Sequence, residues 1–479
     1  MAFSNSFKQN GRPSRLSQAL RGLLTALEIA ADFATAVFAI NLSYFLKVWM
    51  SSGNIHFARP AWDVERIAVL VAGLIVILLK ADGAYRGSGS LLKIRETERA
   101  LRSSTQACCL LIPVSFLFGL TISPSFFCLV LLCLPICQGL QKQCVLRVTK
   151  WLHTRGIGVQ RTIVYGAGST GRRLLSAIWA SPNQGWHPIL VIDDNPALWG
   201  QRLFGLGYRR AGVGAIAEGP ITRTLLMEHE CDLLIIAVPS LPQEKLDKVL
   251  SAAQEAQVRV AFLSDQSMAI NDCMESVDID GLFLMSVGTP QSRAWYDISK
   301  WLFDTCGAAI LLILFSPLLL LTMILITSES RGGPFFRQDR IGKRGRRFRI
   351  WKFRSMYKNV SAYEVSPSTP MDARITKVGR FLRKTSFDEL PQLMNVLTGD
   401  MSLVGPRPEM PFLVEQYNEF QQQRLEAMPG ITGLWQLSAD RAYHIHENIQ
   451  YDLYYFRHRG FFMDVAILLH TIIFAVRGI

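Results

Sequence analysis

Four apolar stretches separated by short connections dominate the first third of the chain. They occupy residues 23–45, 67–79, 107–122 and 126–140. A helix needs about 20 apolar residues to cross a bilayer, and several of these stretches are somewhat shorter. Because the stretches cluster and their connections are short, the pattern predicts four transmembrane helices within residues 23–145, preceded by a tail at residues 1–22.

Lysine and arginine are distributed unevenly among the connections. The tail carries four, the loop at 80–102 carries six, and the segment at 142–161 carries five. The connection between the first two stretches has three, and the loop at 121–125 has none. Cytoplasmic loops are enriched in these residues. The charge pattern therefore predicts that the N-terminal tail, the middle loop and everything after residue 141 lie in the cytoplasm.

Strands and helices alternate in the next part of the chain. Apolar runs typical of buried strands lie at residues 161–165, 189–192, 232–237 and 258–263. The segments between them, such as residues 243–257, repeat apolar positions with helical spacing. This alternation is typical of a parallel, doubly wound sheet, so we expect a Rossmann-like cytoplasmic domain at residues 160–268.

A glycine-rich turn follows the first of these strands and opens a helix. Its glycines are Gly166, Gly168 and Gly171, and the acidic pair Asp193-Asp194 follows Gly171 by 22 residues. This spacing is close to that of dinucleotide-binding sites, which would make the glycines cofactor-binding residues. The alternative is that the glycines only let the turn close and the helix pack against the sheet.

The third part of the chain follows a linker expected at residues 269–298 and begins with an apolar helix at residues 301–326. Its middle contains Ser316-Pro317. A proline inside a helix removes a hydrogen bond and clashes with the preceding turn. A kinked transmembrane helix is one interpretation. Basic residues flank both ends of the helix, which favours a re-entrant helix with a membrane break at this pair.

Positive charge concentrates just past this helix. Residues 331–358 contain eleven Lys and Arg residues and one acid, Asp339, with aromatic residues between them. The pattern alone would allow nucleic-acid binding or a solvated basic face. Beside an apolar helix, it favours anionic lipid headgroups or a phosphorylated substrate.

The composition agrees with a membrane protein. Hydrophobic residues make up 49% of the chain and charged residues only 19%, and the net charge is +13. A soluble domain averages about 25% charged residues, and a disordered chain is far less apolar. The nine cysteines show no metal-ligand or disulfide spacing, so we interpret them as small apolar residues in a reducing compartment.

An adjacent acidic pair, Asp388 and Glu389, stands at the expected start of a helix. Apolar residues recur with helical spacing after the pair, Pro391 fits only the first turn, and Gly399 is a plausible stop. The helix N-terminus would stabilise an ionised Asp388, which could then act as a nucleophile toward phosphorus. The alternative is structural, because Ser386-x-x-Glu389 matches a capping box and Asp388 could be an N-cap.

Phosphoryl transfer also needs cations near the nucleophile, to neutralise developing negative charge. Arg383 and Arg407 are near the acidic pair in sequence, and Arg binds phosphate through two donors at once. Lys352 and Arg354 belong to the basic segment and are further candidates for binding substrate phosphate.

The C-terminal part of the chain resembles a known family over about residues 299–479. The resemblance rests on WKFRSM (351–356), DARIT (372–376), LRKTSFDELPQL (382–393), GDMSLVGPRP (399–408) and PGITGLWQ (429–436). These runs are similar to those of the monotopic phosphoglycosyl transferases, bacterial enzymes that act on polyprenyl phosphate. The four predicted helices and the Rossmann-like insert resemble the large members, such as undecaprenyl-phosphate glucose or galactose phosphotransferases.

The resemblance implies a two-step reaction. Asp388 would attack the β-phosphate of a UDP-sugar, giving an aspartyl phospho-sugar and UMP, and undecaprenyl phosphate would then accept the sugar phosphate. Glu389 would assist through Mg²⁺ or by handling protons, and Asp388 and Glu389 would hold the ion. Arg383 and Arg407 occupy positions of phosphate-binding arginines.

The resemblance also implies a place in the cell. We expect a catalytic domain at residues 299–479 on the cytoplasmic face of the bacterial inner membrane, in contact with lipids and not with nucleic acid. The product would initiate exopolysaccharide, capsule or O-antigen synthesis. The sequence does not indicate which hexose is transferred or whether the chain forms a homo-oligomer.

Two rival functions and three local features complete the expectations. Tyr296-x-x-x-Lys300 has the spacing of a nucleotide-sugar dehydratase or epimerase, and a non-enzymatic membrane scaffold is the other alternative. His444, His446 and Glu447 are interpreted as a polar surface rather than metal ligands. The run Ser438-Ala-Asp-Arg441 departs from the family pattern by one residue. The helix expected at residues 461–476 is short for a span and is assigned to the interface.

Overall fold

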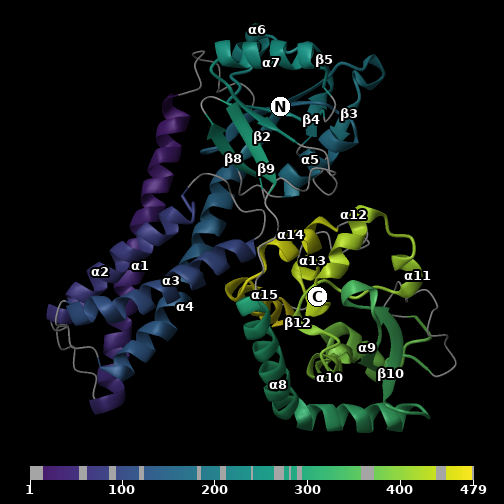
Figure 1. The fold of residues 1–479 in the computed structure, drawn as a ribbon. Coiled ribbons are helices and arrows are strands. Elements are labelled where there is room, and N and C mark those ends of the chain that lie inside the picture. The colour runs from purple at the N-terminus through teal and green to yellow at the C-terminus, as the bar shows by residue number, and fades with distance from the viewer. Residues whose placement is uncertain are drawn as a thin grey trace. The chain divides into compact units, whose positions relative to one another are not determined.

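The structure is a computed structural model that forms two compact units, Met1–Ala269 and Ile270–Ile479, each described here by itself (Figure 1). It describes residues 15–52, 62–85, 93–117, 123–180, 185–204, 212–238, 241–263, 274–279, 282–287, 294–357, 372–437 and 449–476. Three described helices are long and apolar enough to cross a membrane, at Gly22–Ser51, Pro124–Thr154 and Trp295–Glu329.

Helices form where the four N-terminal apolar stretches predict them. They are α1 (Arg15–Ser52), α2 (Trp62–Ala81), α3 (Lys93–Leu117) and α4 (Pro124–Thr154). Among the described residues of this unit, α1 and α4 meet the requirements of a span. Charged residues lie near both ends of α2, and charges fill the first half of α3. The predicted count of four spans therefore stays a prediction.

Two acidic residues interrupt the apolar face of α1, and the bundle neutralises them. The Nζ of Lys142 on α4 lies 2.8 Å from Glu28 Oε1 and 2.8 Å from Asp32 Oδ2. The hydroxyl of Tyr85 donates to Asp32 at 2.7 Å. Lys142 and Asp32 are fully buried, and a buried charge requires such partners.

The predicted parallel sheet is confirmed. Its five strands have the order β5-β2-β1-β6-β7, and every adjacent pair is parallel. The strands are β1 (Gln160–Tyr165), β2 (Trp186–Asp193), β5 (Ala217–Glu218), β6 (Leu233–Ile236) and β7 (Arg259–Phe262). The unit also contains η2 (Pro196–Leu198), and β3 (Arg202–Phe204) pairs with β4 (Gly212–Ala215).

Both faces of this sheet are covered, because alternate residues of a strand point to opposite faces. Ile163 and Tyr165 of β1 pack in one apolar cluster with residues of α6 (Arg223–Glu228) and α7 (Gln243–Glu255). Val164 packs in another cluster with Leu175 of α5 (Ser169–Ala180). The arrangement is the doubly wound one that the sequence predicts.

The glycine-rich turn of this sheet makes close contacts within the chain. Gly166 has a φ of +113°, and a Cβ on Gly171 would overlap the carbonyl of Gly166. The backbone N–H of Ala167 donates to Asp193 Oδ2 at 2.6 Å, so the expected acidic residue binds the turn itself. These contacts support the packing interpretation of the glycines. Gly168 has open space around it.

The second unit combines a long helix with short elements. They are β8 (Met274–Ile279), β9 (Leu282–Val287), α8 (Ala294–Glu329), β10 (Phe335–Ile341), η5 (Lys343–Gly345), β11 (Arg347–Phe353), α9 (Lys377–Thr385), η6 (Phe387–Glu389), α10 (Gln392–Leu397), β12 (Ser402–Val404), α11 (Pro411–Val414), α12 (Glu419–Gln422), η7 (Gln423–Glu426), β13 (Gly430–Thr432), α13 (Leu434–Leu437), α14 (Gln450–His458) and α15 (Phe461–Val476). β8–β9 and β10–β11 are antiparallel hairpins, and β12 pairs with β13 in parallel. The segment expected as a linker thus contains a hairpin.

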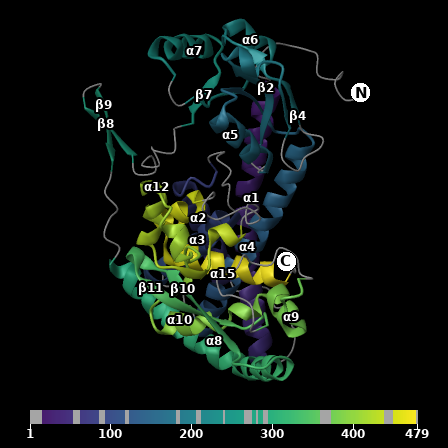
Figure 2. The same cartoon turned by 90° about the vertical axis from the view of Figure 1, so that its right-hand side faces the viewer.

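The long helix α8 bends sharply part-way along its length (Figure 1). Pro317 lies inside it and has no N–H to donate to the carbonyl of Ile313. The hydroxyl of Ser316 donates to that carbonyl at 2.7 Å, which explains why serine and proline occur together. The helix extends beyond the predicted residues 301–326 at both ends, and it packs against α9 and α10 (Figure 2).

The last helix, α15, has the predicted bounds of Phe461 and Val476 and is shorter than a span. Met463, Ala466 and Ile467 are buried in the unit, whereas Ile472 and Ile473 are exposed. One face of the helix therefore belongs to the core, and the interfacial assignment of the other stays a prediction.

Candidate active site

The acidic pair lies in a tight turn between two helices. α9 ends at Thr385, Ser386 adopts a left-handed conformation with a φ of +58°, and η6 carries Asp388 and Glu389. α10 begins only after Pro391, at Gln392, four to five residues later than the start at about residues 387–388 that the sequence predicts. Among the described residues, the Ser386 side chain makes no capping hydrogen bond. The capping-box alternative is therefore wrong.

Glu389 is held between two cations that come from other elements. Its Oε1 lies 2.7 Å from Lys352 Nζ on β11 and 2.8 Å from an amino nitrogen of Arg407, in the loop after β12. The second amino nitrogen of Arg407 lies 3.4 Å from Oε2. Burial would raise the pKa of Glu389, but Arg407 and Lys352 outweigh it and hold that pKa well below its usual value. Glu389 is thus a fixed anion.

The pKa of Asp388 is shifted upward, opposite to that of Glu389. Burial raises its pKa above the ordinary value; Lys352, Arg383 and Arg407 oppose the rise, and the neighbouring charge of Glu389 adds to it. The sequence led us to expect an Asp388 stabilised as an anion, so the direction differs from the expectation. Two adjacent carboxylates with opposite pKa shifts are typical of sites where the two have different roles.

The predicted phosphate-binding residues separate into two groups. Lys352, Arg383 and Arg407 all lie close enough to Asp388 to lower its pKa. Arg354 lies elsewhere: its guanidinium donates to the carbonyl and the hydroxyl of Ser330 at 2.8 Å each, where α8 ends. It therefore satisfies the free carbonyls of a helix C-terminus.

The other basic residues of the β10–β11 hairpin are mostly exposed. The basic segment that the sequence singled out is therefore not one surface. Lys352 belongs to the acidic pair, Arg354 to the end of α8, and the remaining charges to the outer face of the hairpin. Binding of lipid headgroups or of a phosphorylated substrate to that outer face stays a prediction.

Two residues without a predicted role position the cations. Arg424 is buried and donates to the carbonyl of Arg407 at 2.8 Å, while its own charge is balanced by Asp452 at 2.7 Å. Asn395 on α10 accepts from the N–H of Trp351 at 2.9 Å and donates to the carbonyl of Arg349 at 2.8 Å. It thereby fixes the strand that carries Lys352. Asn395 lies between two of the runs that carry the resemblance, residues 382–393 and 399–408, but nothing local marks Arg424.

The loop that carries Arg407 is shaped by contacts between glycines. β12 and β13 pair in parallel, with Ser402 opposite Gly430 and Val404 opposite Thr432. A Cβ on Gly405 would overlap the carbonyl of Met428, and a Cβ on Gly430 would overlap the backbone of Gly405. The runs GDMSLVGPRP and PGITGLWQ therefore form one structural piece.

The DARIT run leads into α9 and has contacts of its own. Arg374 pairs with Asp372 at 2.7 Å and lowers the pKa of that carboxyl to about 2. Thr376 caps α9 through its hydroxyl, which accepts from the N–H of Gly379 at 2.9 Å. The carboxylate of Glu329, at the end of α8, accepts from the N–H groups of Lys377 and Val378. The end of α8 and the start of α9 are thus joined.

The magnesium ion that the resemblance implies would need ligands beyond the acidic pair. No group of three His, Cys, Asp or Glu side chains that could hold a metal occurs among the described residues. Both oxygens of Glu389 already accept hydrogen bonds from Lys352 and Arg407. Mg²⁺ is usually bound by one or two carboxylates together with substrate phosphates. Asp388 and the phosphates of a bound donor are the ligands that the site could offer to Mg²⁺.

The rival interpretation of Tyr296 and Lys300 does not match their contacts. Both side chains donate to Asp464 on α15, at 2.8 and 3.0 Å, so they connect helices of the second unit. Arg441, His444, His446 and Glu447 lie outside the described residues. Their predicted roles are neither supported nor opposed by the structure.

A family model described as bacterial sugar transferase matches residues 295–478. A UDP-N-acetylgalactosamine-undecaprenyl-phosphate N-acetylgalactosaminephosphotransferase of Aeromonas hydrophila is 40% identical over 52% of this chain and 63% of its own length. The matched part of this chain thus spans just under two thirds of that relative.

Two further relatives match over greater shares of their length. A UDP-galactose-lipid carrier transferase of Erwinia amylovora is 38% identical over 68% of this chain and 70% of its own length. A UDP-glucose:undecaprenyl-phosphate glucose-1-phosphate transferase of Escherichia coli (strain K12) is 28% identical over 86% of this chain and 90% of its own length. The chain therefore belongs to the bacterial sugar transferases, the family of polyprenyl-phosphate sugar-1-phosphate transferases that its motifs resemble.

Proposed function

We propose that this enzyme transfers a hexose-1-phosphate from a UDP-sugar to undecaprenyl phosphate and releases UMP. The observation that carries the proposal is an acidic pair with opposite pKa shifts, surrounded by Lys352, Arg383 and Arg407. The relatives of Aeromonas hydrophila and Escherichia coli are named as transferases from a UDP-sugar to undecaprenyl phosphate. The product would be the first lipid-linked sugar of an exopolysaccharide, capsule or O-antigen repeat unit.

The first step is an attack by Asp388 on the β-phosphorus of the donor. A bond forms between a carboxylate oxygen and phosphorus, and the bond from phosphorus to the bridging oxygen breaks. UMP leaves with that electron pair, and the sugar phosphate stays on Asp388. In the second step, a phosphate oxygen of undecaprenyl phosphate attacks the same phosphorus and Asp388 leaves as a carboxylate.

The surrounding charges suit both steps. Negative charge develops on the phosphoryl oxygens during each transfer, and fixed cations stabilise it without rearranging. Glu389 stays ionised and holds Lys352 and Arg407 in place. The raised pKa of Asp388 also increases its basicity, and hence its nucleophilicity, once it has lost its proton. Asp388 and the donor phosphates would hold Mg²⁺, whose charge would add to that of the fixed cations.

We further propose that α8 enters and leaves the membrane on the cytoplasmic side of the inner membrane. Its bend, Pro317 and the Ser316 hydrogen bond support a break at this point. Glu329 and Arg354 attach its far end to the catalytic elements, and Tyr296 and Lys300 attach its start to α15 of the same unit, which supports both ends lying on one face. The bend would then place the acidic pair at the membrane surface, where the acceptor phosphate lies.

The test is release of UMP from the full-length chain given a donor but no acceptor. A panel of UDP-sugars identifies the donor, and Asp388→Asn should then abolish the stoichiometric release that wild type shows. Asp400→Asn is the matched control, because Asp400 lies in a neighbouring motif and its carboxylate accepts an exposed hydrogen bond from Thr398. Normal release by Asp388→Asn would contradict the assignment. No release by wild type without acceptor would contradict the aspartyl intermediate, and no release with undecaprenyl phosphate added would favour the scaffold alternative.

A further inference from the structure

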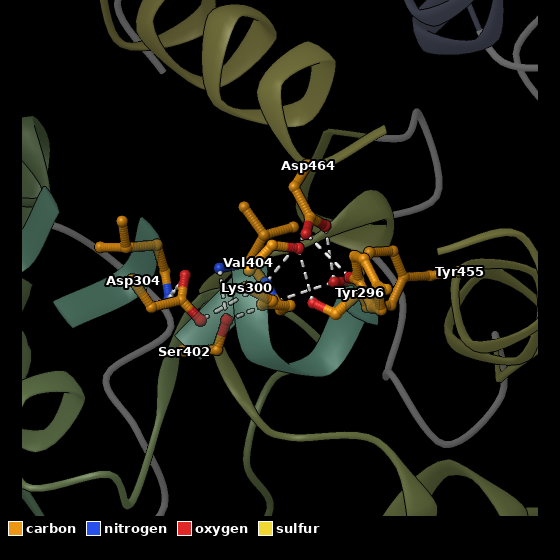
Figure 3. A network of polar contacts seen from close by, with 9 residues as sticks. Tyr296, Lys300, Asp304, Ser402, Val404, Tyr455 and Asp464 are labelled. Carbon is orange, nitrogen blue, oxygen red and sulfur yellow. Dashed lines mark hydrogen bonds and ion pairs between the residues drawn. The ribbon is translucent and has the colours of Figure 1, made fainter. Parts of the chain in front are cut away.

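A buried carboxylate joins three elements of the second unit (Figure 3). Asp464 on α15 accepts from the hydroxyl of Tyr296 at 2.8 Å and from Lys300 Nζ at 3.0 Å, both on α8. The hydroxyl of Tyr455 on α14 lies 2.7 Å from its other oxygen. Asp464 is only 2% exposed. We call Asp464, Lys300, Tyr296 and Tyr455 the Asp464 cluster.

The same cluster reaches the strand that leads to Arg407. The hydroxyl of Tyr455 lies 3.0 Å from the carbonyl of Val404, the last residue of β12. Lys300 also pairs with Asp304 at 3.5 Å, and Asp304 accepts from the N–H of Leu403 at 3.3 Å. Figure 3 shows these side chains converging between α8 and β12. Only two residues separate Val404 from Arg407.

Polar contacts hold this junction where apolar packing could have held it. An apolar replacement of a buried ion pair is often equally stable or more so, so stability alone does not call for charges here. Hydrogen bonds differ from apolar contacts because they fix direction as well as distance. The cluster thus fixes the start of a membrane helix relative to the loop that carries an active-site cation.

We infer that the Asp464 cluster is a positioning device that sets the height of the acidic pair above the membrane, and so the delivery of the acceptor phosphate. This inference rests on the proposed function. The acceptor phosphate is confined to the bilayer surface, so its distance to Asp388 depends on how α8 is attached. The nucleotide sugar arrives from solution and has no such constraint. The cluster therefore acts more strongly on the lipid step than on the donor step, which it reaches only through the loop that carries Arg407.

The test compares the two substrates in wild type and Asp464→Asn, using full-length chain in vesicles that contain undecaprenyl phosphate. Asn keeps the shape of Asp but removes the charge that Lys300 faces. We expect the KM for undecaprenyl phosphate to rise about tenfold, since a misplacement of 1 Å can cost about 100-fold. The KM for the UDP-sugar and the amount of UMP released without acceptor should change much less than the lipid KM. Asp297→Asn is the control, because Asp297 is exposed on the same turns of α8.

Two further variants keep the inference falsifiable if Asp464→Asn does not fold. Tyr455→Phe removes one hydroxyl and should also raise the KM for undecaprenyl phosphate. Lys300→Arg keeps the positive charge and should raise this KM less than Asp464→Asn does. An unchanged lipid KM in the folded variants overturns the inference, as does an equal loss in both steps. The lipid KM comes from overall transfer, so it can be measured even if wild type forms no aspartyl intermediate.

Discussion

Replacing Glu389 by Gln removes the anion that Lys352 and Arg407 share. Gln has nearly the same shape and keeps one oxygen to accept a hydrogen bond, so the perturbation is chiefly the loss of charge. Two cations then remain in a mostly buried site, where Glu389 itself is 17% exposed. We therefore expect the variant to be destabilised in the absence of a ligand, although no large side chain is lost.

The size of the effect follows from the two ion pairs. At 2.7 and 2.8 Å, each pair contributes ~6 kcal/mol of Coulomb attraction at an effective dielectric constant of about 20. Most of this attraction is offset by the cost of removing the charges from water. Breaking a buried pair by removing one partner costs about 3 to 5 kcal/mol. In a domain of this size, that loss lowers the Tm by about 6 to 20 °C.

The assay is thermal unfolding of the purified full-length chain, followed by tryptophan fluorescence. Glu415→Gln is the matched control, because Glu415 pairs with Arg347 at 3.6 Å and both side chains are 69% exposed. Such exposed pairs contribute about 0 to 1 kcal/mol. Adding UDP, whose anionic diphosphate replaces the lost charge, should raise the Tm of Glu389→Gln more than that of wild type. Equal Tm values for the two Glu→Gln variants would refute the buried ion cluster.

Three further predictions concern pH, the glycine turn and the end of α8. Asp388 must lose its proton to attack, and its pKa lies above the ordinary 3.8, so donor-only UMP release should fall with decreasing pH at higher pH values than for an exposed Asp. A pH profile of that release checks this; a limb at or below the ordinary value would contradict the burial argument. Gly168→Ala should leave sugar transfer intact because the position is open, whereas Gly171→Ala should destabilise the first unit; their Tm values and transfer rates distinguish the two, and rescue of Gly168→Ala by added dinucleotide would instead indicate a nucleotide site. Arg354→Met leaves the carbonyl and hydroxyl of Ser330 without their donor, at a cost of about 1 to 3 kcal/mol in unfolding experiments. An unchanged Tm would show that the end of α8 does not need this arginine.

The sequence pattern predicted the bounds of an element correctly where the element's own residues determine them. The strand expected at residues 161–165 is observed at Gln160–Tyr165, and α15 has its predicted bounds. The long helix is different, because hydropathy detects only the apolar part of α8. The helix extends back to Ala294 through Tyr296 and Lys300, whose partner Asp464 is more than 160 residues away. A contact at that separation leaves no periodic signal in the sequence.

The candidate site shows the same limit more sharply. The motifs identify Asp388, Glu389 and Arg407, but burial of a carboxylate depends on residues from several elements. The local pattern Ser386-x-x-Glu389 also allowed a capping box, but in the structure Glu389 pairs with Lys352 and Arg407 instead. For the same reason, the raised pKa of Asp388 could not be derived from its position in a turn.

The close approach of Gly405 and Gly430, which leaves no room for a Cβ on either, affects how variants of this enzyme will be interpreted. Gly405, two residues before Arg407, lies against the backbone of a segment about 25 residues further along, and a Cβ on Gly433 would also overlap the carbonyl of Gly405. A substitution in PGITGLWQ can therefore displace an active-site cation without altering any group that reacts. In a library of random variants, such a change will resemble the loss of a catalytic residue. Measuring the Tm together with the activity distinguishes variants that disturb the backbone around Arg407 from variants that lose a reacting group.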